Sequence, residues 1–162
     1  MNKEELNKVL ENHKHWIYED CEGWETMKAD LRSANLYGAN LYGADLRSAK
    51  NVPFIPYACP DFGMFIGFKK AQDHIVVLEI PEDAKRLSAT GRKCRCDKAK
   101  VLEIQNLDGT KADINEVRSD YTAAFIYKVG ETVCVDDFCE DRWEECSAGI
   151  HFFINRQEAV NY

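Results

Sequence analysis

Residues 85–100 could bind an anion, because they carry the densest run of basic side chains in the sequence. Seven of them are Lys or Arg, and a single one is Asp. Residues 131–146 mirror this composition with seven carboxylates and a single Arg. Charge runs are commonly solvated or paired with each other. Internal pairing with the acidic block and binding of an external anion are therefore the two alternatives for the basic block.

The predicted anion site combines a turn with the strand that follows it. Thr90 and Gly91 precede Arg92, so backbone N–H groups and a guanidinium could meet on one phosphate. On a strand, Lys93 and Arg95 would share one face. One chain offers a shallow surface, which favours a pocket between two subunits with tyrosines as a stacking wall. The predicted ligand-binding residues are Arg92, Lys93, Arg95, Thr90, Lys98, Tyr37 and Tyr42. The alternatives for the stacking wall are Trp143 and Tyr162.

Cysteines are the second group that could do chemistry, and the chain has seven of them. The first candidates for zinc ligands are Cys94, Cys96, Cys134 and Cys139, but their spacing matches no zinc knuckle or ribbon. Free cysteine is also among the most buried residue types. We therefore expect reduced thiols, no bound metal and no cofactor.

Cys146 and His151 are a weaker candidate pair for nucleophilic catalysis. Five residues of chain do not guarantee contact, and no Asn or Asp can be assigned to orient the imidazole. The sequence contains no Walker loop, dinucleotide fingerprint, nucleophile elbow or H-E-x-x-H motif. No catalytic residue is predicted, and an enzyme is the less favoured class.

The elements that must position these residues begin with an N-terminal helix. Asn2 and Glu5 predict a capping box at the start of a helix over 3–17, whose apolar residues follow helical spacing. His13 should pack near this apolar stripe, and His15 should be solvated. Three prolines between residues 51 and 60 then exclude a regular helix.

The remaining chain predicts a mostly antiparallel α+β module. The expected strands are 63–68, 74–80, 94–104, 122–129, 132–135 and 150–154. The fourth and fifth of these strands would form a hairpin around Gly130. A short helix is expected over 81–87, with Pro81 at its first position. Asn155 should cap a terminal helix, with Glu158 as its capping-box partner.

Residues 29–49 read ADLRS-ANLYG-ANLYG-ADLRS-A, which is a repeat of five residues. Five residues turn an α-helix by about 500°, so successive leucines would not share a face. On a strand, an odd spacing would alternate the faces. A chain that turns a corner every five residues places each Leu inside and Ala in the other inward slot. Asp and Asn suit the corners because they tolerate left-handed backbone.

The repeat resembles the pentapeptide-repeat family, whose pattern is A-(D/N)-L-x-x. The resemblance implies a short right-handed quadrilateral β-helix of about one coil. One coil cannot cover its own ends, so the N-terminal helix is expected to act as a lid. Residues 88–104 and 145–162 are also similar to the tails of small pentapeptide-repeat proteins of phages, prophages and Firmicutes. That resemblance implies no activity and no catalytic residue.

Three parts are expected: an N-terminal helix with a capping loop (1–28), the repeat coil (29–53) and the α+β module (54–162). The net charge of −7 excludes a general nucleic-acid footprint. The N-terminus has no signal-peptide pattern, and no apolar run is long enough to span a bilayer. A cytoplasmic location is expected, in the host cytosol if a phage encodes the protein.

The expected function is non-catalytic binding by a phage- or prophage-type accessory protein that forms a homo-oligomer. The partner would be a host protein or a small anionic ligand such as a signalling nucleotide, and counter-defence by sequestration rests on analogy. One alternative is an enzyme that acts on a phosphorylated small molecule through Cys146, His151 or the acidic block. Another is a DNA mimic that inhibits a host DNA-binding protein, for which one coil with outward Arg32 and Arg47 is a poor match.

Overall fold

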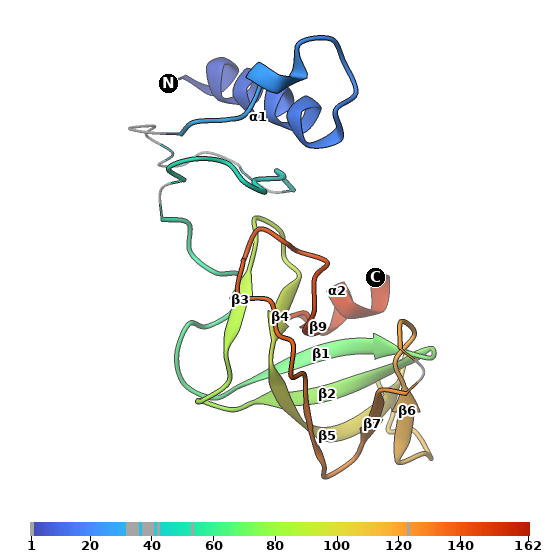
Figure 1. Ribbon diagram of the computed structural model, residues 1–162. Helices are drawn as coiled ribbons and strands as arrows, with labels where there is room; N and C mark the ends of the chain where they lie inside the picture. The colour runs from blue at the N-terminus through green and yellow to red at the C-terminus, as the bar shows by residue number, and fades with distance from the viewer. Residues whose placement is uncertain (1, 32–35, 37–40, 42, 53, 123) are drawn as a thin grey trace.

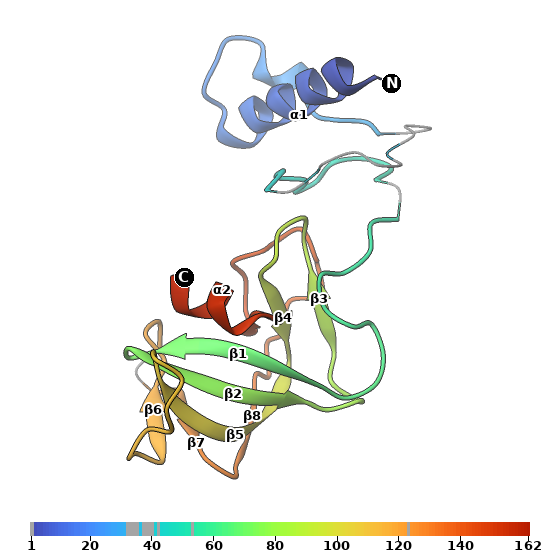
Figure 2. The same ribbon diagram turned by 180° about the vertical axis from the view of Figure 1, so that it is seen from behind.

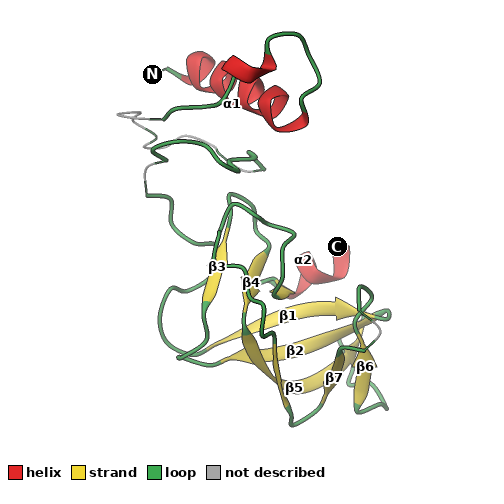
Figure 3. Ribbon diagram, viewed as in Figure 1, coloured by secondary structure: helices red, strands yellow, loops and turns green. Residues whose placement is uncertain are grey.

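The structure is a computed structural model, which describes residues 2–31, 36, 41, 43–52, 54–122 and 124–162 (Figure 1). The helices are α1 (Lys3–Tyr18), the 3-10 helix η1 (Trp24–Thr26) and α2 (Arg156–Asn161). The strands are β1 (Phe65–Ala71), β2 (His74–Ile80), β3 (Arg86–Ser88), β4 (Cys94–Cys96), β5 (Lys98–Asn106), β6 (Glu116–Arg118), β7 (Ile126–Lys128), β8 (Thr132–Cys134) and β9 (Ile150–Phe152). Figure 3 shows helix at both ends of the chain and strand between them, so the predicted mixed α+β class is confirmed.

Helix α1 begins with the predicted capping box. The Asn2 side chain accepts from the Glu5 N–H at 2.9 Å, and the Glu5 carboxylate accepts from the Asn2 N–H at 2.8 Å. His13 is buried as predicted, and its ring stacks on Trp16 with 5.5 Å between the centroids. His15 is partly solvated, with 35% of its side chain exposed, and its Nδ1 also lies 2.6 Å from a carboxylate of the loop that follows the helix. None of the helices in the described residues is long and apolar enough to cross a membrane.

The leucines of the repeat point inward with a period of five. Leu31, Leu41 and Leu46 are buried, and Leu36 is half-buried. Leu6 of α1 joins this cluster, so the helix covers one end of the repeat. Figures 1 and 2 show α1 stacked on the repeat, on the side that faces away from the sheets. Tyr37 and Tyr42 lie outside the described residues.

Two consecutive repeats turn in the same way. The carbonyl of Leu41 accepts from the Ala44 N–H at 2.9 Å, and the carbonyl of Leu46 accepts from the Ala49 N–H at 3.0 Å. Gly43 and Ser48, third in each turn, have φ values of 72° and 56°. In these two turns the left-handed residue is therefore the fifth of the repeat. The described Asp30 and Asp45 do not adopt the positive φ predicted for the corners, and Asn35 and Asn40 lie outside the described residues. Positive φ at the third place of a turn favours Gly, which has no Cβ.

After four pentapeptides the chain runs parallel to, and beside, the residues at which the repeat began. Asp30 and Lys50 form a parallel β-bridge, in which Leu31 N–H donates to the Lys50 carbonyl at 2.9 Å. The Asn51 side-chain amide donates to the Asp30 carboxylate at 2.8 Å, one layer away. The described residues of this segment show no closed solenoid.

The C-terminal part contains three antiparallel sheets among the described residues. Their strand orders are β1-β2-β5-β8, β3-β4-β9 and β6-β7. Gly67 of β1 allows the first two sheets to approach, because a Cβ at this position would lie 2.6 Å from the Phe152 ring of β9. The core lies between these sheets and includes Ile80, Val101 and Phe152.

Three predicted elements of this part are corrected. The helix expected over 81–87 is a turn followed by β3, because the buried Arg86 guanidinium bonds the carbonyls of Pro81 and Glu82 that a helix would have used. The strand expected over 94–104 breaks at Asp97, whose carboxylate accepts from the Lys85 N–H at 2.9 Å. Its two halves, β4 and β5, belong to different sheets.

The expected hairpin around Gly130 is also absent from the described residues. Its first strand, β7, pairs with β6, whereas β8 pairs with β5. Gly130 still turns the chain with φ 88°, but its N–H donates to the Val101 carbonyl of β5 at 2.8 Å. At α2, Asn155 caps as predicted, with 2.8 Å to the Gln157 N–H, while Glu158 pairs with Arg92 rather than completing a capping box.

Candidate functional site

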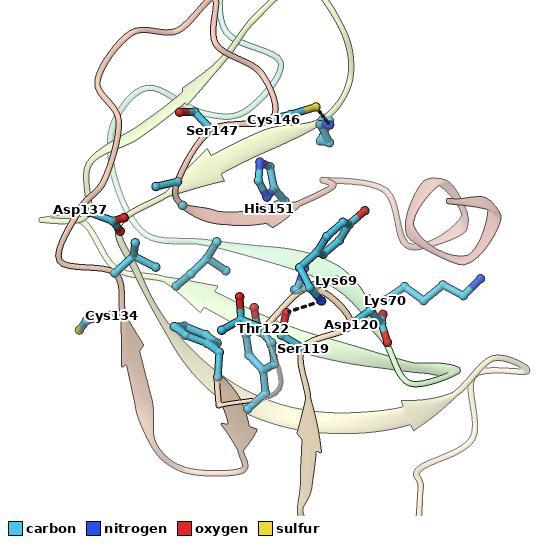
Figure 4. A pocket seen from close by; sticks show the side chains of 18 of the residues that line it. Lys69, Lys70, Ser119, Asp120, Thr122, Cys134, Asp137, Cys146, Ser147 and His151 are labelled. Carbon is cyan, nitrogen blue, oxygen red and sulfur yellow. Dashed lines mark hydrogen bonds between the residues drawn. The ribbon is translucent and has the colours of Figure 1, made fainter.

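A cavity of about 830 Å³ lies between β1, β9 and the β6-β7 hairpin (Figure 4). Strands β1, β7, β8 and β9 contribute to its wall, together with the segments 119–125, 134–137 and 146–149. Figure 4 shows that the labelled side chains come from these separate strands and loops, with Lys70 and Cys134 pointing away from the others. A volume of this size is within the range of small-molecule sites.

Lys69 lies at the base of the cavity, on the core face of β1. Its strand neighbours on this face are Gly67 and Ala71, which are both buried, and Lys69 itself is 8% exposed. Its Nζ lies 5.8 Å from the centroid of the Tyr127 ring. Within the described part of the chain, no carboxylate forms an ion pair with this ammonium. Burial lowers the pKa of Lys69, and the charge of Asp120 opposes that shift in part.

Lys93 is the second buried ammonium of the cavity and precedes β4. Its Nζ lies 3.4 Å from Cys146 Sγ, 3.4 Å from the Tyr162 hydroxyl and 3.7 Å from a Glu145 carboxylate oxygen. Burial lowers the pKa of Lys93, but these three neighbours outweigh burial and raise it above its ordinary value. Lys93 therefore keeps its charge although it is only 9% exposed.

His151 of β9 faces the same cavity and is neutral at pH 7. Its Nε2 lies 3.1 Å from the Glu145 carbonyl. Burial, together with the charges of Lys93 and Lys69, lowers the pKa of His151 to about 4. The neutral His151 adds no charge, so the positive potential of the inner wall comes from Lys69 and Lys93.

The acidic residues of the cavity occupy its rim. Asp120, Asp136 and Asp137 are exposed, in contrast to the two lysines below them. Aromatic rings complete the wall, and Tyr162 packs against Phe153 with centroids 5.3 Å apart. The arrangement can hold an anionic group at its base and a flat apolar group against its side.

Lys93 is the member of the predicted ligand set that the structure brings to this cavity. Arg95 is 1% exposed, and its guanidinium donates to the carbonyls of Ala148 and Asp141 at 2.9 and 2.8 Å. The other described members have these partners: Arg92 Nε with Glu158 at 2.9 Å, Lys98 with Asp83 at 2.6 Å, and the Thr90 hydroxyl with the Ala44 carbonyl at 2.7 Å. These contacts give the four residues structural roles, and their binding of an anion stays a prediction.

The basic and acidic blocks do face each other in part. Lys85 pairs with Glu140, and Lys93 lies beside Glu145. The single Arg of the acidic block, Arg142, bonds backbone carbonyls instead. Its guanidinium donates to the carbonyls of Ile55, Ser88 and Ala89 at 2.6 to 3.0 Å. Pairing with the acidic block is therefore present for Lys85 and Lys93, whereas Arg92 and Lys98 pair with the acids Glu158 and Asp83 outside that block.

The thiols do not gather into one group. Cys94 and Cys96 are buried in β4, whereas Cys134 and Cys146 are exposed along the cavity. Cys146 and His151 thus line one cavity, although their hydrogen bonds go to Lys93 and to the Glu145 carbonyl respectively. All seven cysteines are free thiols in the structure.

Sequence reasoning missed Lys69, although a signal was present. Strict alternation along β1 places Phe65, Gly67, Lys69 and Ala71 on one face, so a lysine interrupts an otherwise apolar row. A charge on the core face of a strand indicates either a buried partner or a cavity. Lys93 was predicted from the positive charge of the basic block. That charge can be read from the sequence without knowing how the strands pair.

Comparison with known families assigns both parts of the chain. A family described as pentapeptide repeats (8 copies) matches residues 28–50. A family of unknown function, DUF5758, matches residues 55–159, which include every cavity residue discussed above except Tyr162. Neither the curated proteins nor the solved structures contain a match. The chain therefore belongs to the family of unknown function DUF5758 and carries a pentapeptide repeat before that domain.

Proposed function

We propose that this protein binds a small anionic ligand in the cavity at Lys69 and Lys93 and does not turn it over. The observation that carries the proposal is Lys69, a buried ammonium that no carboxylate of the described residues neutralises. A buried charge without a counter-ion is costly unless something pairs with it. An anion that enters the cavity would supply that partner and would meet Lys93 as well.

The ligand class follows from the rest of the wall. Tyr121, Phe125, Phe153 and Tyr162 offer aromatic surface around the two ammonium groups. A phosphate or carboxylate joined to an aromatic ring, as in a nucleotide, matches both features. The exposed acids at the rim would disfavour a large polyanion, so a small ligand fits better than a nucleic-acid strand.

Binding without turnover is favoured because two basic groups of the cavity are each held in one protonation state. His151 is neutral at pH 7, and Lys93 is held in its charged form by its neighbours. The second candidate is an enzyme that acts on a phosphorylated small molecule. It is favoured by the approach of Lys93 to Cys146, which places a cation beside an exposed thiol. Turnover of a nucleotide panel that disappears in Cys146→Ser would support the enzyme over the binding protein.

Calorimetric titration with nucleoside mono-, di- and cyclic phosphates tests the binding proposal. We expect one ligand per chain and a loss of at least tenfold in affinity for Lys69→Met. Lys100→Met is the matched control, because Lys100 is an exposed lysine of β5 outside the cavity lining. Equal affinity of Lys69→Met and the parent protein would refute the proposal. Native mass spectrometry of protein purified from cells adds a search for a co-purifying anion.

We also propose that residues 29–51 form one coil of a right-handed, four-sided β-helix. The parallel bridge between Asp30 and Lys50, 20 residues apart, supports a coil of four pentapeptides. The matching turns at Gly43 and Ser48 support one corner per repeat. A phage origin, a counter-defence role, homo-oligomerisation, a cytoplasmic location and a host-protein or DNA-mimic target stay predictions.

A further inference from the structure

The loop that follows α1 brings three potential metal ligands together at the end of the molecule away from the cavity. One donor atom each from His15, Asp20 and Cys21 lies within 4.8 Å of the other two. No other group of three His, Cys, Asp or Glu side chains in the described residues meets this condition. The sulfur of Met27 lies 3.8 Å from Cys21 Sγ and adds a fourth donor.

The local sequence produces this arrangement by reversing the chain twice. Helix α1 ends at Glu19, whose φ of 54° turns the backbone while its N–H donates to the His15 carbonyl at 2.9 Å. This reversal returns Asp20 and Cys21 to the side of His15. Gly23, with φ 80°, then starts the short helix η1, which delivers Met27 back to Cys21.

The geometry points to a site for a soft ion, copper(I), with the Cys21 thiolate, the Met27 thioether and the His15 imidazole as ligands. Two sulfurs bound at about 2.3 Å to one ion with a tetrahedral angle lie roughly 3.8 Å apart. The observed separation of Cys21 Sγ and Met27 Sδ, 3.8 Å, already meets this requirement. A thioether selects a soft ion, whereas zinc takes thiolate, imidazole and carboxylate, and hard ions take oxygen.

The contact between His15 and Asp20 within this group fits the same assignment. His15 Nδ1 lies 2.6 Å from Asp20 Oδ1, so the carboxylate holds the ring through one nitrogen. Metal-binding histidines commonly donate their other N–H to a carboxylate, which fixes the ring orientation. In this role Asp20 would occupy Nδ1, and the proposed ligand of the ion would be Nε2. A simple ion pair that closes the helix would account for this contact but not for the two sulfurs beside it.

Anaerobic titration of the full chain with copper(I), in competition with the chromophoric chelator bicinchoninate, tests the site. We expect Cys21→Ser to remove one copper ion per chain and Met27→Leu, which preserves volume without the sulfur, to weaken its binding by at least tenfold. Cys139→Ser is the matched control, because Cys139 is also a half-buried thiol and lies outside the group. X-ray absorption of the copper-loaded parent protein should show two sulfur ligands and one nitrogen ligand.

Two results would overturn the site. Copper binding that is unchanged in Cys21→Ser would show that other thiols hold the ion. Zinc binding that exceeds copper binding and is unaffected by Met27→Leu would refute the assignment to copper. Circular dichroism of α1 in each variant separates loss of a ligand from loss of the helix, and Met27→Leu keeps the test valid if Cys21→Ser unfolds.

Discussion

Lys69 on β1 lies over the ring of Tyr127 on β7, with 5.8 Å between the ammonium and the ring centroid. Both residues are buried. Burial lowers the pKa of Lys69 and raises the pKa of Tyr127, so the surroundings disfavour the charged form of each group. The base of the cavity thus keeps an ammonium in a place that favours neutral groups, and this ammonium would gain most from a bound anion.

Replacing Lys69 by Met should leave the ligand-free protein as stable as before or raise its free energy of unfolding by up to about 2 kcal/mol. The reason is that an apolar side chain of similar length removes a desolvated charge. Because the pKa of Lys69 is lowered in the folded state, the unfolded state binds more protons above that pKa. The parent protein should therefore become more stable as the pH rises from the folded-state pKa toward the ordinary pKa of a lysine, and Lys69→Met should lack this gain. Urea denaturation at several pH values measures both effects. A clear loss of stability at neutral pH would show that Lys69 has a structural partner.

Acid should destabilise the protein through His151. Its pKa is about 4 in the folded state against 6.5 for an unperturbed histidine, so the unfolded state binds more protons between these values. The free energy of unfolding should therefore fall by about 3 kcal/mol as the pH falls from 6.5 to 4. His151→Gln should remove most of this dependence, and His74→Gln should retain it. A stability that is flat over this window in the parent protein would contradict the burial of His151. The buried His13, whose pKa is also lowered by burial, adds a smaller dependence of the same sign.

The two equivalent turns of the repeat should respond in opposite ways to loss and gain of glycine. Removing the glycine of one turn should lower the stability, and introducing a glycine in the other should raise it. Gly43→Ala should cost about 1 kcal/mol, because φ is 72° and a Cβ there meets nothing within 4 Å, so the penalty is from the backbone alone. Ser48→Gly should stabilise by about 0.5 kcal/mol, since relief of left-handed strain exceeds the entropy that glycine adds to the unfolded state. Thermal unfolding of the two variants compares them directly. If both substitutions destabilised the protein, or both stabilised it, the backbone of the two turns would not be equivalent.

A methyl group at Gly67 should push the two larger sheets apart. Its Cβ would lie 2.6 Å from the Phe152 ring, so Gly67→Ala should lower the free energy of unfolding by about 1–3 kcal/mol. Phe152→Leu in the same chain should recover part of this loss, because the smaller side chain leaves room for the methyl group. A double-mutant cycle gives the coupling energy. Additive effects would show that the contact between residue 67 and the Phe152 ring does not limit how closely the two sheets approach.

The elements that sequence could predict are those with local causes. The capping box of Asn2 and Glu5, the inward leucines of the repeat, and strands β1 and β2 all follow from spacing within a few residues. The break at Asp97 depends on a backbone N–H twelve residues earlier, and the sheet that accepts β8 depends on β5. Such pairings are set by contacts between distant segments, which periodicity along the chain does not report.

The cavity was predictable only in part for the same reason. Lys93 was visible as one charge in a basic block, but its partners Cys146 and Tyr162 come from segments 53 and 69 residues away. Arg95 shares that block, yet its guanidinium is taken up by two carbonyls near β9. Charge density indicated where cations are, and the fold decided which of them face open space.

The return of the chain after 20 residues, seen in the bridge between Asp30 and Lys50, restricts how this protein can change in length. In the four-sided coil proposed above, insertion of four pentapeptides would lift α1 by one strand spacing, about 4.8 Å, and keep its orientation. Insertion of one pentapeptide would instead rotate α1 by roughly a quarter turn relative to the following domain. In that coil the segment would act as a spacer with discrete settings, in which whole coils would set the height of the N-terminal helix and partial coils would change its direction.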